Sequence, residues 1–292
     1  MKILDCTLRD GGYYTDWTFN SDLVLEYAES VKDSGVKIVE LGYISDKKSS
    51  GVYRDLRLLD EEFCKNLENY KLDYSFMIDF KEHDGKSDEE IYNFLSTIPK
   101  SFYAWCRIAV SSKDIDKCIK LADKIKSQLG VRVAINLMYS SSISDKEHSK
   151  ICKKVSGNID CLYIADSYGA MLPSDVSKKL LKMKQFDFLT GVHFHDNLGL
   201  AFANCLSAIE SNVDIIDSTV TGMGRGVGNL KTEQIVAYLD MRDKNKDFSI
   251  SSMISIVEKF NNIKDLCKWG WDIDYMASGC TGVHQKNIRN II

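Results

Sequence analysis

The feature that most constrains the fold is an eightfold alternation of short apolar, β-rich runs with longer amphipathic segments. The apolar runs are residues 2–7, 36–43, 73–79, 102–110, 131–138, 159–165, 189–195 and 213–217. The amphipathic segments that follow them are roughly 21–34, 60–69, 88–97, 113–128, 145–156, 174–185, 199–210 and 232–242. This order predicts an α/β fold with a parallel sheet. Eight units are the number that closes a (β/α)8, or TIM, barrel, and an open doubly wound sheet is the alternative.

The length of 292 residues, with 44% hydrophobic residues, suits one large domain with a sizeable core. We expect residues 1–245 to form a catalytic barrel and residues 246–292 to form a short helical extension that packs on it. Residues 251–265 are the clearest helix of that extension. The Gly-rich and aromatic stretch 269–286 is compatible with an irregular cap over one barrel mouth.

Charge and cysteine usage exclude several classes of protein. The net charge of -4 comes from interspersed charges of both signs, so we expect no nucleic-acid partner and no membrane surface. Asp5 interrupts the N-terminal apolar run, which argues against a signal peptide, and no apolar run approaches the ~20 residues of a membrane span. The nine cysteines form no CxxC pair, which favours free thiols and a cytoplasmic location.

A candidate metal site lies at the end of the seventh predicted strand. His193 and His195 flank Phe194, and strand alternation points both imidazoles to the same side. Asp10 follows the first strand, which neighbours strand eight in a closed barrel, so it can meet the two histidines. Two His and one carboxylate with open coordination positions are typical of a catalytic metal site. A core histidine beside a second, orienting histidine is the alternative.

Other polar residues surround this set. Arg9 is a candidate cation for a substrate oxygen, and Glu40, on the second strand, is its natural partner. Asn136 on the fifth strand and Asp166 at the end of the sixth are candidate substrate-binding residues, although Asp166 is equally suited to cap the next turn.

The segment 221–229 has four alternating glycines, which suit a backbone that approaches a ligand closely. We call it the glycine loop. We expect Gly224 and Gly226 to contact the substrate and Asn229 to offer an oxygen to the metal. A mobile loop without a binding role is the alternative.

Taken together, these motifs resemble a family of metal-dependent lyases and aldolases on TIM barrels. The family includes 4-hydroxy-2-oxovalerate aldolase, hydroxymethylglutaryl-CoA lyase and isopropylmalate synthase. The matching pieces are TLRDG (7–11), Glu40, ADSYG (165–169), HFHDNLGLA (193–201) and GMGRGVGNLKTE (222–233). They run from the first strand to the last, and the resemblance is strongest to the oxovalerate aldolase branch.

The resemblance implies a divalent metal, Mg or Mn by preference, with Zn or Co as alternatives. Its ligands would be Asp10, His193, His195 and Asn229. The metal would bind the carboxylate and keto oxygens of a 2-oxo acid such as pyruvate, and Arg9 would stabilise the enolate. A Lewis acid and a guanidinium facing developing negative charge make such an enolate accessible near neutral pH.

Two departures from the family pattern restrict the activities that we expect of this chain. Where the oxovalerate aldolases carry a His general base, this chain has Tyr13, a poor base at pH 7 that is suited to act as an acid or an orienting group. The glycine loop lacks the Cys that hydroxymethylglutaryl-CoA lyase places there, so that activity is not expected.

Gly282-Val283-His284-Gln285 resembles the segment that supplies a catalytic His to isopropylmalate-type synthases. His284 is therefore a candidate acid or base, and a surface His in a flexible tail is the alternative. Neither the regulatory domain of those synthases nor the full dehydrogenase-docking segment of the aldolases is expected.

The function expected is a metal-dependent aldolase or lyase that acts on small 2-oxo acids and aldehydes, with a homo-oligomer as an open possibility. One alternative is an acyl-CoA-dependent Claisen condensing enzyme, which would release free thiol. The other is a metal-binding barrel that has lost catalysis and serves as a binding or assembly subunit; Tyr13 keeps that alternative open.

Overall fold

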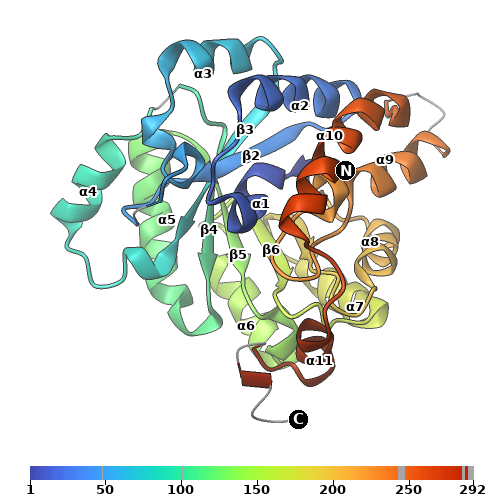
Figure 1. Ribbon diagram of the computed structural model, residues 1–292. Coiled ribbons are helices and arrows are strands. Elements are labelled where there is room, and N and C mark those ends of the chain that lie inside the picture. Colours follow the sequence, from blue (N-terminus) through green and yellow to red (C-terminus); the bar gives the residue numbers. More distant parts are fainter. Residues whose placement is uncertain (48, 100, 243–246, 285–286, 289–292) are drawn as a thin grey trace.

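The computed structural model describes residues 1–47, 49–99, 101–242, 247–284 and 287–288. Its centre is a closed barrel of eight parallel strands in chain order, with β1 also paired to β8 (Figure 1). The strands are β1 (Lys2–Asp5), β2 (Ile38–Tyr43), β3 (Asp73–Asp79), β4 (Trp105–Val110), β5 (Arg132–Leu137), β6 (Cys161–Asp166), β7 (Leu189–Phe194) and β8 (Ile215–Ser218). The expected (β/α)8 barrel is confirmed, and the open doubly wound alternative is wrong.

Each of the eight predicted amphipathic segments forms a helix around the barrel (Figure 1). These helices are α2 (Ser21–Asp33), α3 (Glu61–Glu68), α4 (Asp88–Ser96), α5 (Ile115–Leu129), α6 (Asp145–Val155), α7 (Pro173–Met183), α8 (Ala201–Glu210) and α9 (Thr232–Asp240). Local chemistry sets several starts. The side chains of Asn20, Asp60, Ser87 and Ser144 accept hydrogen bonds from backbone N–H groups of the first turns of α2, α3, α4 and α6.

The barrel interior is divided along its axis. Apolar side chains fill the end where the strands begin, among them Leu4, Ile38, Trp105 and Ile215. Polar side chains follow on the same strands nearer their carboxyl ends. The interior is therefore a packed core at one end and a polar site at the other, the end where TIM barrels carry their active sites.

The segment Thr7–Thr15 forms helix α1, which is not among the eight predicted amphipathic segments. Its two adjacent glycines are poor helix formers, and they concealed the helix. Close packing explains them. A Cβ on Gly11 would lie 2.4 Å from the sulfur of Met223, and a Cβ on Gly12 would lie 2.1 Å from the Trp17 indole. The indole N–H of Trp17 donates to the Arg9 carbonyl at 2.9 Å, so this packing also fixes the backbone at Arg9.

Strand β2 contains a bulge between Glu40 and Gly42, where its pairing with β3 shifts by one residue. Glu40 pairs with Ser75 and Tyr43 pairs with Met77. Tyr43 is three positions after Glu40, whereas Met77 is only two positions after Ser75. Regular alternation would put Glu40 and Tyr43 on opposite faces of the strand. The bulge instead brings both to the inner face.

The chain after β8 and α9 returns to the barrel. Helix α10 (Ile254–Cys267) buries Phe260, whose ring packs 6.0 Å from that of Tyr27 on α2. Helix α11 (Ile273–Thr281) replaces much of the irregular cap expected over 269–286. Its Tyr275 carbonyl accepts a hydrogen bond from Asn197, just after β7. The expected domain boundary at 245 lies outside the described residues, and the division into two domains stays a prediction.

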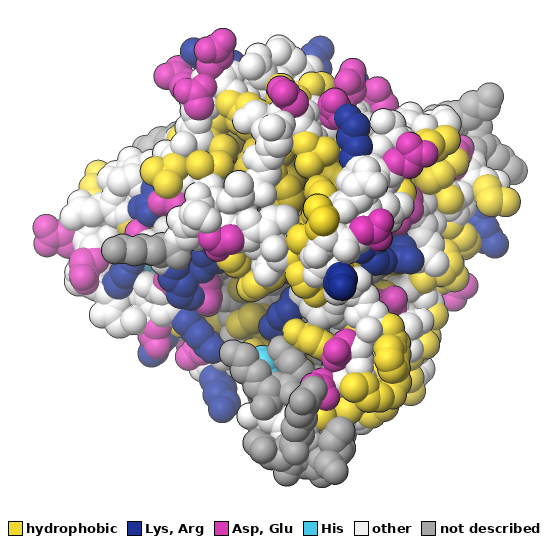
Figure 2. Space-filling view, in the orientation of Figure 1, with side chains coloured by type: hydrophobic (Ala, Val, Ile, Leu, Met, Phe, Trp, Pro, Cys, Tyr) yellow, Lys and Arg dark blue, Asp and Glu magenta, His cyan; other side chains and the backbone are white. Residues whose placement is uncertain are grey.

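The surface agrees with the charge pattern of the sequence. On the face seen in Figure 2, Lys and Arg side chains alternate with Asp and Glu rather than gathering in one basic field. All nine cysteines are free thiols. In the part of the chain that is described, no helix is long and apolar enough to cross a membrane.

The packing of α1 predicts that one Gly→Ala substitution lowers the free energy of unfolding, which is the opposite of the usual effect in a helix. Gly→Ala inside a helix normally stabilises by about 1 kcal/mol. Gly12→Ala should instead lower the free energy of unfolding by roughly 1–3 kcal/mol, because the new methyl overlaps the Trp17 indole. Urea denaturation measures the effect. In a Trp17→Ala background the same substitution should be neutral or stabilising, and destabilisation of equal size in both backgrounds would refute the explanation.

Candidate active site

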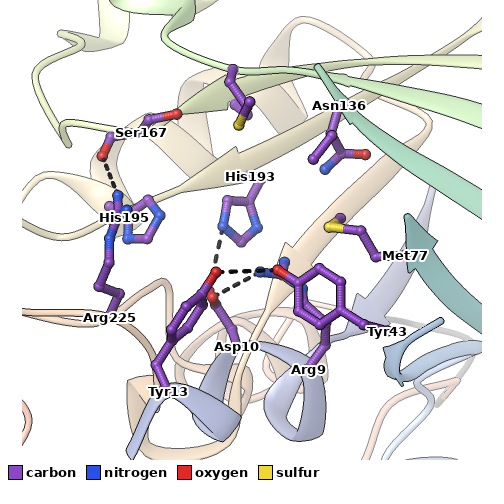
Figure 3. A pocket seen from close by; sticks show the side chains of 13 residues that line it. Arg9, Asp10, Tyr13, Tyr43, Met77, Asn136, Ser167, His193, His195 and Arg225 are labelled. Carbon is purple, nitrogen blue, oxygen red and sulfur yellow. Dashed lines mark hydrogen bonds and ion pairs between the residues drawn. The ribbon is translucent and has the colours of Figure 1, made fainter. Parts of the chain in front are cut away.

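A pocket of about 100 Å³ opens at the carboxyl ends of the strands. Figure 3 shows the side chains that line it converging from α1, several strand ends and the glycine loop. They are Arg9, Asp10, Tyr13, Tyr43, Met77, Ala109, Asn136, Met138, Ala165, Ser167, His193, His195 and Arg225. Asp10 and both histidines thus meet in one pocket, as the sequence analysis predicted, and Asp10 is carried by helix α1.

Two buried guanidinium groups connect the acids of the site. Arg9 donates through Nε to Glu40 and through Nη1 to Asp10, both at 2.7 Å. Arg107 on β4 lies with its Nη1 3.0 Å from the other oxygen of Glu40 and donates through Nη2 to Asp217 on β8. Glu40 is therefore held between two cations and does not line the pocket.

The chain of charges closes through His193. Its Nδ1 is 2.9 Å from Asp217 Oδ2, and its Nε2 is 3.6 Å from Asp10 Oδ2. We call the six residues the charge ring: Asp10, Arg9, Glu40, Arg107, Asp217 and His193. The Asp217 contact directs Nε2 of His193 toward Asp10, which is how a carboxylate orients a metal-binding imidazole.

The charge ring has one negative charge in excess when His193 is neutral, because three carboxylates face two guanidinium groups. Burial by itself would raise the pKa of Asp10, but the positive charge of Arg9, with smaller effects from the neighbouring histidines and from Asn229, holds it well below its usual value. For Asp217, burial is likewise outweighed by Arg107 and His193, and the pKa is lowered. Both carboxylates are ionised near neutral pH, so the site attracts a cation.

Several features of the donor set suit a divalent metal. Asn229 donates through Nδ2 to Asp10, while its Oδ1 is buried and has no hydrogen-bond partner in the described part of the chain. Cys6 Sγ also lies with ligand atoms of Asp10 and His193 inside one 4.8 Å group. Burial raises the pKa of Cys6 well above its usual value, so its side chain is a neutral thiol in the metal-free site.

His195 completes the set from the same strand end. Its ring centroid lies 5.2 Å from that of His193, at an interplanar angle of 80°. No hydrogen bond joins either ring nitrogen of His195 to any residue that the structure describes. Burial, with the charge of His193 next, lowers the pKa of His195 well below its usual value. The imidazole is therefore neutral, the form that binds a metal.

The remaining predicted residues divide into two groups. Tyr13 and Asn136 line the pocket. Asp166 does not: its two oxygens accept the backbone N–H groups of Ala170 and Met171 at 3.1 and 2.9 Å, so it closes the turn after β6. His284 lies just beyond α11 and is also absent from the lining. Its neighbour Gln285 lies outside the described residues.

Gly224 and Gly226 also lie away from the pocket lining, because other side chains occupy the space beside them. A Cβ on Gly224 would lie 2.3 Å from the Asn229 amide, and a Cβ on Gly226 would lie 2.3 Å from the Tyr275 ring. These glycines make room for Asn229 and for α11. Their predicted contact with substrate stays a prediction that this packing does not favour.

Sequence reasoning did not place Asp217, Tyr43 or Arg225 at the site, where the structure finds them. Asp217 had a usable signal, since it is an acid in an apolar strand whose neighbour carries the two histidines. Tyr43 had none, because the bulge in β2 is not visible in the alternation. Arg225 is the single charged residue within the glycine loop, and this isolated charge could have indicated a place in the site.

Comparisons with known proteins place this geometry in context. A model of the HMGL-like family matches residues 85–260. The 4-hydroxy-2-oxovalerate aldolase of Chloroflexus aurantiacus is 35% identical over 264 residues, which cover 88% of this chain and 74% of the relative. That of Geobacillus genomosp. 3 is 28% identical, with 82% and 70% covered. An oxaloacetate decarboxylase of Mycobacterium tuberculosis is 24% identical, with 98% and 85% covered.

Two solved structures resemble this barrel. The N-terminal domain of a candidate aldolase from Bacteroides vulgatus superposes with a TM-score of 0.88 at 31% identity, covering 100% of this chain and 96% of that one. The carboxyl transferase domain of Rhizobium etli pyruvate carboxylase, solved with pyruvate, has a TM-score of 0.76 at 13% identity. It covers 100% of this chain and 52% of the other, and it supports the fold alone.

The donor set predicts the effect of removing a ligand. Asp10→Asn and His195→Ala should each abolish stoichiometric Mn²⁺ binding, measured by calorimetric titration of metal-free protein, while far-UV circular dichroism keeps the barrel signal. His148→Ala is a matched control, because His148 is a buried histidine on α6 that does not line the pocket. Full metal stoichiometry in both ligand variants would defeat the assignment.

The contact between Asp217 and His193 predicts a smaller effect on metal affinity, because Asp217 contacts a ligand and is not itself one. Asp217→Asn should lower the affinity for Mn²⁺ by roughly 10- to 100-fold, because His193 loses the carboxylate that orients its ring. Asp214→Asn is the control, since Asp214 pairs with Lys184 and Thr190 near the start of β8. Equal affinities in the Asp217 variant and the wild type would show that the contact does not orient the ligand.

Proposed function

The chain belongs to the HMGL-like family, and from that premise we propose that it is a divalent-metal-dependent aldolase acting on a 2-oxo acid. The reaction makes or breaks the carbon–carbon bond next to the carbon that becomes the enolate. The relatives named 4-hydroxy-2-oxovalerate aldolase confirm the expected class, an aldolase-like carbon–carbon lyase. They also support 4-hydroxy-2-oxo acids as substrates for this chain.

The observation that carries the proposal is the arrangement of Arg9 beside the metal-binding candidates Asp10 and His193. Nε and Nη1 of Arg9 are held by Glu40 and Asp10, while Nη2 makes no hydrogen bond to a described residue. Arg9 also lines the pocket. A rigid cation with a free N–H group is preorganised to stabilise negative charge that develops on an oxygen beside it.

The cleavage direction can be written with its atoms balanced. The 4-hydroxyl proton passes through the Tyr13 hydroxyl, which gives up its own proton to water at the pocket mouth. The C3–C4 bond breaks, C4 becomes an aldehyde carbonyl, and the electron pair forms the C2–C3 enolate. Protonation at C3 then releases pyruvate. Arg9 donates to the enolate oxygen. A divalent cation, when bound by Asp10, His193, His195 and Asn229, would supply the Lewis acid that polarises the 2-keto group.

The proton is handled by the tyrosine pair at the pocket wall. Tyr13 and Tyr43 hydroxyls lie 3.3 Å apart. Burial raises the pKa of Tyr43 well above its usual value, so it stays protonated and can donate to Tyr13. Tyr13 is 49% exposed and can exchange protons with water. We assign Tyr13 the acid and orienting role, in the place where the family carries a His base.

Several further features of the proposal follow from the pocket and from the chain as a whole. Mg or Mn suits the oxygen donors, whereas two imidazoles also accommodate Zn or Co. The relatives named 4-hydroxy-2-oxovalerate aldolase favour the aldolase over the Claisen alternative. Nine free thiols support a reducing, cytoplasmic compartment. Self-association stays an expectation.

The test is metal-dependent pyruvate release. Protein loaded with Mn²⁺ should release pyruvate from 4-hydroxy-2-oxovalerate, followed through lactate dehydrogenase, and EDTA should abolish the signal until Mn²⁺ is restored. Arg9→Gln should lower kcat by roughly 10²–10³-fold, because the enolate loses its cation.

The same assay separates the alternatives. Thiol release from acetyl-CoA with a 2-oxo acid, in place of pyruvate release, would favour the condensing enzyme. Metal binding without turnover across a panel of aldehydes and 2-oxo acids would favour the binding subunit.

A further inference from the structure

Arg225 is a pocket cation for which the proposed chemistry has no role. It lies at the tip of the glycine loop, and Figure 3 shows it beside His195, with Arg9 and Tyr43 on the other side of Asp10. Its one hydrogen bond in the described structure runs from Nη2 to the backbone carbonyl of Ser167 at 3.2 Å. A neutral carbonyl positions a guanidinium but does not neutralise it.

The contrast with the other two arginines of the site is sharp. Arg9 and Arg107 each contact two carboxylates. Arg225 forms no ion pair with any residue in the described part of the chain, although it is half-buried. A guanidinium has five N–H donors in a planar fork that matches a carboxylate, so most of the donors of Arg225 remain available to a ligand.

The position of Arg225 indicates which part of a substrate it would meet. Arg9 is 5% exposed and lies beside Asp10 and His193, where the enolate would form. Arg225 lies further out, on a loop at the rim beside the end of β6. A 2-oxo acid with its C1 and C2 oxygens at the buried metal site would extend its distal carbons toward that rim.

The tip of the loop is held in place. The Gly226 carbonyl accepts hydrogen bonds from Tyr14 Oη at 3.0 Å and from the Gly270 N–H at 3.2 Å. Arg225 therefore projects from a backbone braced by α1 and by the segment between α10 and α11. A braced cation loses less conformational freedom when it binds an anion than one on an unanchored tip.

We propose that Arg225 makes this enzyme selective for 4-hydroxy-2-oxo acids that carry a second carboxylate beyond the scissile bond, so that the aldehyde released is itself an anion. This inference rests on the proposed aldolase function and specifies its substrate class. The second carboxylate pairs with the Arg225 guanidinium, while the 2-oxo acid end occupies the metal site and Arg9.

A matched substrate pair tests the inference. 4-Hydroxy-2-oxoglutarate and 4-hydroxy-2-oxovalerate have the same chain length. The glutarate ends in a second carboxylate, whereas the valerate ends in a methyl group. Wild-type, Mn²⁺-loaded protein should cleave the glutarate with a kcat/KM about 10- to 100-fold higher. Arg225→Gln, which removes the positive charge and keeps a polar side chain, should remove that preference and leave the kcat/KM for the valerate within about threefold.

Arg242→Gln is the matched control, because Arg242 is an exposed arginine packed over the Tyr238 ring and does not line the pocket. It should keep the preference. Arg225→Lys should keep part of it, since a lysine supplies the charge without the planar fork. Equal losses for both substrates in Arg225→Gln would overturn the inference, because Arg225 would then serve the shared 2-oxo acid end.

Binding separates a failure of this inference from a failure of the aldolase proposal. 2-Oxoglutarate and 2-oxovalerate lack the 4-hydroxyl and cannot undergo the cleavage. Calorimetry should show tighter binding of 2-oxoglutarate to the wild type by about tenfold or more, and Arg225→Gln should abolish the difference. That result supports the selectivity even if neither hydroxy acid is cleaved. Equal affinities in the wild type, or a glutarate preference that survives in Arg225→Gln, would overturn it.

Discussion

The charge ring is the constraint on which the site depends. Asp10, Arg9, Glu40, Arg107, Asp217 and His193 come from α1, β2, β4, β7 and β8, so the ring forms only when the barrel closes and β8 lies beside β1. Glu40 has no contact with the pocket, yet it positions the two arginines. Substitution of one residue of the charge ring affects its neighbours in the ring. Each neighbouring charge loses its partner, and because the site is buried, water cannot replace that partner.

Burying so many charges is a poor way to stabilise a fold, since apolar residues of the same volume would serve as well or better. The interior near the starts of the strands is filled with apolar side chains instead, among them Leu4, Ile38, Trp105 and Ile215. The change from apolar to charged side chains along the same strands therefore marks a functional boundary. Above it, one carboxylate is in excess, and Oδ1 of Asn229 has no hydrogen-bond partner among the described residues; both features favour the binding of a cation.

Much of this could be read from the sequence because it depends on short-range periodicity. Alternation in β7 places His193 and His195 on one side with Phe194 on the other, and the eightfold repeat brings strand one next to strand eight. The failures arise where the local pattern does not reveal the structure. Gly11 and Gly12 conceal helix α1 because their need for space comes from Met223 and Trp17, which are distant in sequence or lie beyond the helix. Tyr43 was missed because one extra residue in β2 reverses the alternation.

Arg225 and Asn229 share one loop but are anchored differently. Asn229 is bridged to His195 at the end of β7, whereas the tip at Gly226 is held by Tyr14 and Gly270, both outside the barrel sheet. The two residues to which we assign substrate choice and metal binding therefore have separate supports, although only a few positions separate them. A lineage built on this barrel can replace the tip residue and recruit a different aldehyde while its catalytic centre is inherited intact.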